Sequence, residues 1–352
     1  MADVYQKLAK HLDNLPAGFP PTENGVELRI LKRLFTPEEA EIASGLMMMP
    51  EPDGAIAARL GRDEKELAPM LESMSQKGLI FRHTKDGVTT YMAAQFVVGI
   101  WEYHLNDLDK DLIRDVNEYL PILMKERVLK QKTKQLRVVP VSKSMKAEMT
   151  IMPYDVAEEI IRKQKKILVA PCICRREHEM VGKGCGKPME TCLVFGTGAQ
   201  FYQENGLGRY ISQDEALNVL KTGLEAGLVL QPGNSQKPAN ICMCCGCCCQ
   251  VLKNLKKFDS PAKAINSNYY AVVDAENCTA CETCVDRCQM DAITVEDVAK
   301  VNVDRCIGCG LCVTHCPTDA ISLHQKETQE QYIPPKNLFE TYMTMAQERG
   351  LI

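Results

Sequence analysis

The alternation of hydrophobic and polar residues is clearest between residues 28 and 94, where it predicts three helices. Thr36 and Glu39, with a proline between them, form the capping-box pattern of a helix N-terminus. A second short helix is expected at 55–60, with Asp53 as its N-cap. In the third helix the apolar residues recur three or four positions apart, and they are Leu67, Met70, Leu71 and Met74.

Two strands are expected after these helices, at 79–83 and 89–93, around the turn sequence Lys85-Asp86-Gly87. Three helices followed by a hairpin is the element order of a winged helix. The stretch IAARLGRDEKELAPMLESMSQKGLI, residues 56–80, resembles the helix-turn-helix segment of winged-helix regulators. This resemblance implies a winged-helix-like domain.

Beyond the hairpin, the hydrophobic pattern predicts one amphipathic helix from Phe96 to Leu120. A basic strip at 125–147 follows, with Glu126 as its acidic residue. Its basic residues are Lys125, Arg127, Lys130, Lys132, Lys134, Arg137, Lys143 and Lys146. Residues 138–140, Val-Val-Pro, predict an extended crossing between domains. We expect the strip to contact an acidic partner or to lie as a linker on the cluster domains.

Composition changes this picture mainly through cysteine. All eighteen cysteines lie between Cys172 and Cys316. The net charge is −4, so no strong overall field attracts nucleic acid. A disulfide-stapled chain is expected to be small and to begin with a signal peptide, whereas this sequence has Asp3 early and no apolar core there. No stretch approaches the ~20 apolar residues that cross a bilayer. We therefore expect a cytoplasmic protein whose thiols bind metal, and exposed low-potential clusters would favour an anaerobe.

Eight of the cysteines form an internal repeat. Two sets share the spacing Cys-x2-Cys-x2-Cys-x3-Cys, and each member of the first set reappears 28 residues later. The flanks at 291–295 and 319–323 repeat as well. The two sets are Cys278, Cys281, Cys284 and Cys288, then Cys306, Cys309, Cys312 and Cys316. Three cysteines spaced in this way can wrap three corners of a cubane. Residues 265–325 therefore resemble a bacterial ferredoxin, a βαβ pseudo-repeat that holds two 4Fe–4S clusters.

The resemblance also implies which cysteines bind which cluster. In this family the fourth ligand comes from the partner repeat, so the sets cross. One cluster would take Cys278, Cys281, Cys284 and Cys316, and the other Cys306, Cys309, Cys312 and Cys288. A zinc site needs only pairs of cysteines and would not explain two complete quartets. Gln289 stands where the family usually has proline, as at Pro317. It adds a backbone N–H that can bond to sulfur and shift one reduction potential.

The other ten cysteines lie in the middle of the chain: Cys172, Cys174, Cys185, Cys192, Cys242, Cys244, Cys245, Cys247, Cys248 and Cys249. Adjacent cysteines point in different directions, so the run at 242–249 cannot direct six thiols to one metal. We favour at least one further iron–sulfur cluster, with a zinc site or a thiol–disulfide relay as alternatives. One possible quartet is Cys172, Cys174, Cys185 and Cys192, completed or replaced by members of the later run. Arg175 and Arg176 either neutralise a ligated cluster or form an ordinary solvated pair.

The sequence thus predicts an α+β, multi-domain protein. Its expected parts are an N-terminal arm (1–27), a winged-helix-like domain (28–120), a basic linker (121–151), a cysteine-rich cluster-binding domain (152–257), a two-cluster ferredoxin domain (265–325) and a C-terminal helical tail (326–352). Taken together, the chain resembles multi-domain iron–sulfur proteins of anaerobes that join such domains.

Two functions fit this architecture. The first is an iron–sulfur protein that relays single low-potential electrons to a protein redox partner, as a component of an oxidoreductase complex. The second is an iron–sulfur, redox-sensing DNA-binding regulator. The six histidines show no metal-ligand spacing, and no serine or carboxylate set has the pattern of a hydrolase site. We therefore assign no catalytic residues.

The expected third helix of the winged helix favours the electron carrier. A DNA reader brings Arg, Lys or Asn to base edges from this helix. Here the helix begins Asp63-Glu64-Lys65-Glu66 and continues with Pro69 and Glu72. Its exposed face is net negative, so DNA phosphates would repel it. We expect this domain to dock a protein rather than DNA.

Overall fold

The structure is a computed structural model that describes residues 3–146, 149 and 151–352. Five residues lie outside the described part of the chain: residues 1–2 of the expected arm, and Ala147, Glu148 and Thr150 of the expected linker. The chain forms two compact units. The N-terminal unit comprises Met1–Gln131, Thr197–Arg209 and Met345–Ile352, and the cysteine unit comprises Lys132–Gly196 and Tyr210–Thr344. None of the described helices is long and apolar enough to cross a membrane.

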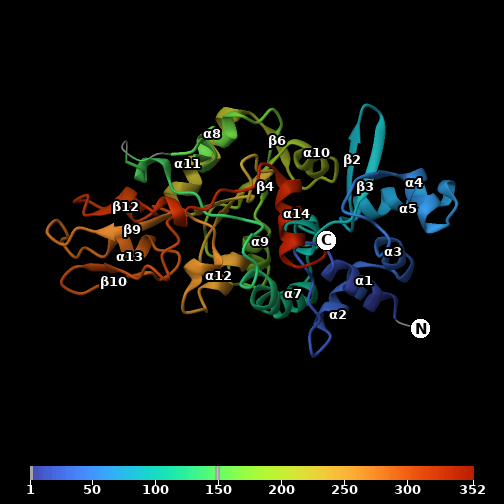
Figure 1. Cartoon of the computed structure of the whole chain (residues 1–352), viewed down its shortest axis with the longest axis horizontal. Helices are drawn as coiled ribbons and strands as arrows, with labels where there is room; N and C mark the ends of the chain where they lie inside the picture. Colours follow the sequence, from blue (N-terminus) through green and yellow to red (C-terminus); the bar gives the residue numbers. More distant parts are fainter. Residues whose placement is uncertain (1–2, 147–148, 150) are drawn as a thin grey trace. The chain divides into compact units, whose positions relative to one another are not determined.

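The N-terminal unit is mainly helical (Figure 1). Its helices are α1 (Val4–Asp13), α2 (Val26–Leu34), α3 (Pro37–Ala43), α4 (Asp53–Leu60), α5 (Glu64–Gln76), α6 (Trp101–Tyr103) and α7 (Lys110–Leu123). Its strands are β1 (Glu51–Pro52), β2 (Phe81–Lys85) and β3 (Val88–Met92). The boundary between the two units falls inside three further elements. These are α10 (Gly196–Glu204), β6 (Arg209–Ile211) and α14 (Leu338–Glu348).

The predicted helix starts are confirmed in one case and wrong in another. Thr36 and Glu39 form the reciprocal capping box at the start of α3. Asp53, in contrast, does not cap α4. It is the first residue of that helix, and Pro52 precedes it as an N-cap with no side-chain hydrogen bond. The Asp53 carboxylate instead accepts a hydrogen bond from the N–H of Gly54 at 2.9 Å.

The hairpin is present with shifted bounds. β2 and β3 are antiparallel, and the last pair of the ladder joins Lys85 and Val88. The two residues between them, Asp86 and Gly87, both have positive φ angles, which is the backbone of a type I′ turn. β1 pairs with the other edge of β3, giving the strand order β1-β3-β2. The element order is therefore helix, short strand, two helices and a hairpin.

The single helix expected from Phe96 to Leu120 is wrong. The backbone leaves helical angles at Val97, Val98 and Gly99, α6 is only one turn long, and α7 begins at Lys110. The side chain of Asp109 accepts hydrogen bonds from two N–H groups of the first turn of α7 and so starts a new helix. The apolar spacing persists across the break, which is why the sequence pattern concealed it.

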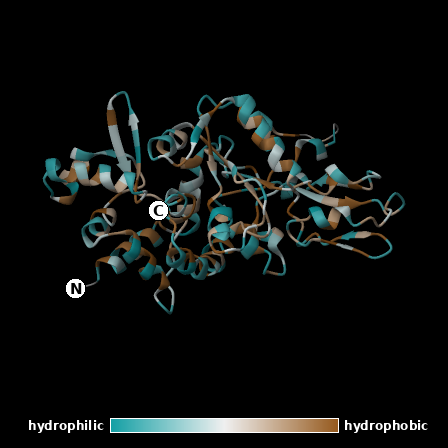
Figure 2. Cartoon of the chain, turned by 180° about the vertical axis from the view of Figure 1, so that it is seen from behind, coloured by the Kyte–Doolittle hydropathy of each residue, from teal (hydrophilic) through white to brown (hydrophobic). Residues whose placement is uncertain are grey.

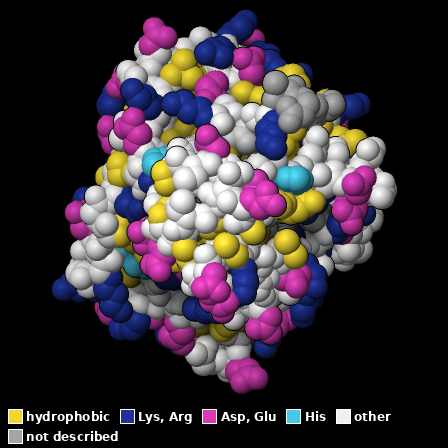
Figure 3. Space-filling view, turned by 90° about the vertical axis from the view of Figure 1, so that its left-hand side faces the viewer, with side chains coloured by type: hydrophobic (Ala, Val, Ile, Leu, Met, Phe, Trp, Pro, Cys, Tyr) yellow, Lys and Arg dark blue, Asp and Glu magenta, His cyan; other side chains and the backbone are white. Residues whose placement is uncertain are grey.

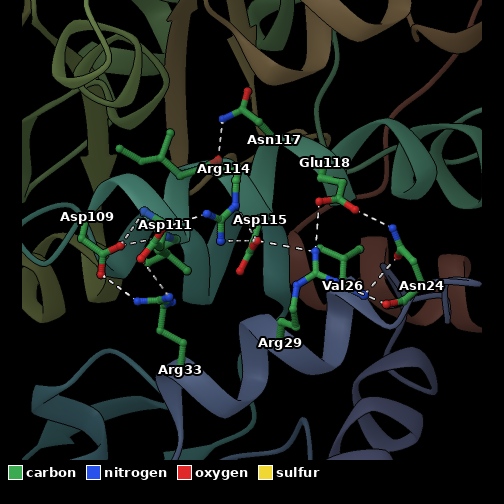
Figure 4. Close-up of polar contacts among 12 residues, drawn as sticks. Asn24, Val26, Arg29, Arg33, Asp109, Asp111, Arg114, Asp115, Asn117 and Glu118 are labelled. Carbon is green, nitrogen blue, oxygen red and sulfur yellow. Dashed lines mark hydrogen bonds and ion pairs between the residues drawn. The ribbon is translucent and has the colours of Figure 1, made fainter.

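Ion pairs join α2 to α7 along their exposed edges (Figure 4). Arg29 lies 3.0 Å from Glu118 and 3.6 Å from Asp115, and Arg33 lies 3.2 Å from Asp109. The pairs of Arg29 with Glu118 and of Arg33 with Asp109 are exposed and contribute little to stability, whereas the carboxylate of Asp115 is buried. The helices are held mainly by their apolar faces, and Figure 2 shows hydrophobic and hydrophilic residues alternating along them.

The cysteine unit is built on a five-stranded sheet in the order β6-β4-β5-β8-β7, followed by two small ladders. Its strands are β4 (Ile167–Pro171), β5 (Glu190–Phe195), β7 (Val229–Pro232), β8 (Asn240–Cys244), β9 (Tyr269–Val273), β10 (Ile293–Val295), β11 (Ala299–Val301) and β12 (Ile321–Gln325). Its helices are α8 (Ala157–Arg162), α9 (Ile173–Met180), α11 (Gln213–Glu225), α12 (Gln250–Leu255) and α13 (Thr283–Arg287).

Strand β8 directs apolar side chains to one face of the sheet and thiols to the other. Because side chains alternate along a strand, Ile241 and Met243 of β8 point to one face, and Cys242 and Cys244 point to the other. The apolar face packs against α8 and α11 in one hydrophobic core. Cys242 also pairs directly with Cys192 of β5, so their thiols lie on the same face. The register of the sheet therefore gathers cysteines that are 50 residues apart in the sequence.

The expected linker is divided between the two units, because 121–131 belong to the N-terminal unit and the cysteine unit begins at Lys132. Val139 bridges to Leu230 of β7, and the N–H of Val141 donates to the carbonyl of Cys309 at 3.0 Å. Arg137 of the basic strip is buried and forms an ion pair with Asp155 at 2.7 Å. This residue is therefore engaged within the cysteine unit.

The ferredoxin-like segment repeats its backbone as well as its cysteines. β9 pairs with β12, and β10 pairs with β11, in antiparallel ladders. Positive φ angles occur at three pairs of positions that are 28 residues apart: Ala280 and Gly308, Glu282 and Gly310, Asp291 and Asp319. The two halves of the segment thus follow the same turns, as the sequence repeat predicts.

Candidate metal centres

The eight cysteines of the repeat line two hollows, and each hollow takes one cysteine from the other half of the repeat. The first hollow is lined by Cys278, Cys281, Cys284 and Cys316. The second is lined by Cys288, Cys306, Cys309 and Cys312. These are the crossed sets that the ferredoxin resemblance implies. The thiols therefore fit two four-ligand clusters by donor number and by position.

Backbone N–H groups are directed at several of these sulfur atoms. The N–H groups of Ala271, Ala292 and Ala299 lie 3.3–3.4 Å from the Sγ atoms of Cys306, Cys288 and Cys278, respectively. Such donors stabilise the negative charge of ligated thiolates.

The loop of the second repeat needs glycine for space. A Cβ at Gly308 would lie 2.1 Å from the carbonyl oxygen of Tyr269, and the φ angle of Gly308 is +67°. Glycine is the residue that accommodates both the left-handed backbone and this close approach.

The two hollows differ in exposure. Cys281 in the first is exposed, whereas Cys312 in the second is buried. Hydrogen bonds from Thr283 lower the pKa of the Cys281 thiol, and burial raises the pKa of the Cys309 thiol to about 12. The first set thus includes an exposed cysteine, whereas the four cysteines of the second are half-buried or buried; we call them the open set and the enclosed set.

Gln289 connects the enclosed centre to the cysteine run of the middle segment. Its side-chain oxygen accepts a hydrogen bond from the N–H of Gly246 at 2.8 Å. The sequence suggested a different role, a hydrogen bond from the backbone N–H of Gln289 to sulfur. The observed contact gives a physical reason for glutamine beside Cys288, because proline has no side-chain oxygen to accept this bond.

Replacing Gly246 by alanine is expected to separate these two segments. An added Cβ would lie 2.1 Å from the carbonyl oxygen of Gln289, although the φ angle of Gly246 is not left-handed. Overpacking against backbone costs about 1–3 kcal/mol. We expect a lower thermal midpoint, measured without oxygen by loss of visible absorption.

Gly184→Ala is the matched control for this substitution. A Cβ at Gly184 meets its nearest atom at an ordinary 3.5 Å. Its midpoint is expected to stay close to that of the unchanged protein. Equal stability of both variants would contradict the close approach of Gly246 to Gln289.

The ten middle cysteines divide into two groups. The four-thiol group comprises Cys185, Cys245, Cys247 and Cys248, whose Sγ atoms all lie within 4.8 Å of one another. The six-thiol group forms a row of successive contacts in the order Cys172, Cys174, Cys249, Cys244, Cys242 and Cys192. The run at 242–249 therefore contributes three thiols to each group, in agreement with the expectation that it cannot serve one metal.

The quartet suggested from the sequence is not brought together. Cys172, Cys174 and Cys192 belong to the six-thiol group, whereas Cys185 lies in the four-thiol group. Cys185 is separated because it comes from the irregular segment after α9. Sequence spacing alone does not show where such a segment returns to the sheet.

The six-thiol group lies where α9 and α12 begin. Cys172 is the N-cap residue of α9, and Cys249 is that of α12. A hydrogen bond with Cys174 and the guanidinium of Arg175 lower the pKa of the Cys172 thiol to about 7. The first N–H groups of a helix favour a thiolate over a thiol. The thiols of this group are therefore favoured in their thiolate form, which is the form that binds a metal.

Two amide side chains that the sequence analysis missed also face this group. Asn240 donates to the sulfur of Cys242 at 3.6 Å, and Gln231 donates to that of Cys249 at 3.8 Å. Strand alternation could have identified Asn240, because it precedes Cys242 by two residues on β8. Gln231 is placed by the pairing of β7 with β8.

Arg175 and Arg176 have different environments. Arg176 is exposed, whereas Arg175 is 2% exposed. Arg175 contacts Cys172 of the six-thiol group, and its Nη1 lies 3.9 Å from the Sγ of Cys245 in the four-thiol group. One guanidinium therefore faces both groups, and these thiols raise its pKa against the effect of burial.

A comparison with protein families matches the model of the 4Fe–4S binding domain, Fer4, at residues 271–294 and 299–322. These two matches cover the two halves of the repeat. The comparison with curated proteins found no match. The comparison with solved structures found no match either. Together with the two tandem motifs, the family match indicates that this protein binds 4Fe–4S clusters through its C-terminal segment, and the further cysteines leave room for more.

Proposed function

We propose that this protein is a cytoplasmic electron carrier, or the electron-transfer component of an oxidoreductase complex, that passes single low-potential electrons to a protein partner. When bound, a 4Fe–4S cluster supplies reversible one-electron chemistry. The observation that supports the proposal best is the pair of crossed cysteine sets, one of which includes the exposed Cys281. With such a pair, an electron would enter at the cluster of the open set and pass on to the cluster of the enclosed set.

The charge around the open set indicates what kind of partner would dock there. Residues 271–322 contain nine acidic and three basic residues. The acidic residues are Asp274, Glu276, Glu282, Asp286, Asp291, Glu296, Asp297, Asp304 and Asp319. Acidic, basic and hydrophobic side chains are interspersed on the face shown in Figure 3.

The three basic residues of this segment leave it with a net charge of −6, and Lys256 outside it pairs with Asp291 at 2.7 Å. Arg287 and Arg305 direct their guanidinium groups at backbone carbonyls, and Lys300 pairs with Glu296 at 2.6 Å. A partner with a basic surface would therefore be steered to this end of the molecule.

The six-thiol group is where we place a further iron–sulfur cluster. It supplies more than the four thiolates that a cubane needs, and it is lined by helix N-termini and amide donors. The loop that follows Cys244 contacts Gln289 beside the enclosed ferredoxin set. A cluster in this group would therefore lie along the same chain of contacts as the ferredoxin clusters.

The N-terminal unit supports docking to protein better than to DNA. Its element order is that of a winged helix, and α5 would be the reading helix. Glu64 and Glu66 lie in the exposed first turn of α5. Arg82 of the hairpin is buried, donates to Ser75 and lies 3.4 Å from Glu204. It is therefore engaged within the unit and does not offer its charge to phosphate.

The metal content tests the proposal. Protein purified without oxygen is expected to be brown and to contain about eight irons from two 4Fe–4S clusters, or about twelve with a third. A low-potential donor should reduce more than one cluster reversibly, by one electron each. Iron analysis and electron paramagnetic resonance during a redox titration measure both quantities.

Two results would contradict this function. About four or fewer irons per chain would remove the two-cluster relay. Tight binding to a defined DNA site that changes with cluster oxidation would make the redox-sensing regulator the better interpretation. We expect negligible sequence-specific DNA binding at physiological salt in either redox state.

A further inference from the structure

We propose that the four-thiol group binds a single zinc ion, which fastens the loop between the sheet and α12. This inference goes beyond the electron-transfer function, because the ion would have a structural role and carry no electrons. Its ligands are Cys185, Cys245, Cys247 and Cys248. Because thiolates bind zinc, four thiols release their protons as the ion enters.

The separation of the sulfur atoms carries the argument. A zinc ion with Zn–S bonds of about 2.3 Å holds its four sulfur atoms about 3.8 Å apart at the corners of a tetrahedron. All four Sγ atoms of this group lie within 4.8 Å of one another, and those of Cys247 and Cys248 are 3.8 Å apart. The group already has the size of a site for one ion.

A cubane needs a wider set of thiols. Each of its four thiolates binds a different iron atom, so the sulfur atoms lie roughly 6 Å apart. Among the described residues, no three of the eight ferredoxin cysteines bring their Sγ atoms within 4.8 Å of one another. The structure therefore distinguishes the ferredoxin sets from the four-thiol group by size. The compact group fits one ion and the wider sets fit clusters.

The surroundings of the group also favour a closed site of negative charge. Zinc with four thiolates carries about two negative charges. Arg175 is 2% exposed and lies 3.9 Å from the sulfur of Cys245. A buried guanidinium needs an anionic neighbour, and thiolates on zinc would supply one. The backbone N–H of Lys187 is also hydrogen-bonded to the sulfur of Cys185.

The position of the group explains what the ion would hold together. The irregular segment 183–188 contains Cys185, and the turn at 245–248 contains the other three ligands. Neither segment has regular secondary structure of its own. Cys244 and Cys249, which flank the turn, both belong to the six-thiol group. A zinc ion in the turn would therefore set the distance between these two thiols.

Metal analysis of full-length protein purified without oxygen tests the inference. We expect about one zinc ion per chain, and X-ray absorption at the zinc edge should show four sulfur ligands at about 2.3 Å. Cys185→Ser and, separately, Cys247→Ser should lower the zinc content severalfold and leave the iron of the two ferredoxin clusters unchanged. Cys247 is exposed, so its substitution threatens folding least.

Cys192→Ser is the matched control, because this thiol belongs to the six-thiol group. Its zinc content should equal that of the unchanged protein. The inference is overturned if the Cys185 variant keeps its zinc, if zinc is absent from the unchanged protein, or if the zinc edge shows nitrogen or oxygen ligands. Iron bound by the ferredoxin cysteines is counted independently, so failure here would leave the electron-transfer proposal standing.

Discussion

Replacing Cys316 by alanine is expected to damage the cluster that Cys278, Cys281 and Cys284 hold, and to lower the iron content by up to about four per chain. Cys316 lies at the end of the second repeat, yet it lines the hollow of the first. Its loss removes one of four thiolates from that centre. The measurement is iron and sulfide analysis, together with the paramagnetic signals of the reduced protein.

Cys309→Ala is the comparison variant, because Cys309 lines the second hollow. The two variants should lose different signals, and Cys281→Ala should lose the same signal as Cys316→Ala. Loss of one common signal in the Cys316 and Cys309 variants would contradict the crossed arrangement. It would instead mean that each repeat supplies all four ligands of its own cluster.

Replacing Arg175 by methionine should destabilise the metal-loaded protein strongly. Methionine retains much of the length of arginine but removes the positive charge between the two thiol groups. Removing one partner of a buried charged contact costs about 3–5 kcal/mol. For a unit of this size we expect the thermal midpoint to fall by roughly 10 °C. Differential scanning fluorimetry without oxygen measures this shift.

Arg176→Met is the matched control, since Arg176 is the exposed neighbour of Arg175 on α9. Exposed substitutions of this kind usually stay within about 0.5 kcal/mol. Arg175→Lys keeps the charge but lacks the planar fork that reaches both groups, so its midpoint should lie between those of the other variants. If Arg175→Met and Arg176→Met have equal midpoints, Arg175 does not balance thiolate charge.

Local sequence signals predicted several elements correctly. The capping box at Thr36 and the two-residue turn at Asp86-Gly87 are properties of a few neighbouring residues. The helix expected from Phe96 to Leu120 failed because apolar spacing continues through its break. There the side chain of Asp109 competes locally and starts a new helix. Asp53 was misassigned as a cap because the cap position fell one residue earlier, at Pro52.

The sequence by itself determined the two ferredoxin centres. Their expected ligands have a fixed spacing, and the same cysteine spacing recurs 28 residues later. The tertiary structure alone decided how the other ten cysteines divide. Cys244 and Cys245 are neighbours in the chain but belong to different thiol groups. Side chains alternate along β8, and the pairing of β5 with β8 brings Cys192 to Cys242. The grouping of the thiols therefore depends on the register of the strands and on the segment that brings Cys185 to the turn at 245–248. Neither can be read from the spacing of cysteines along the sequence.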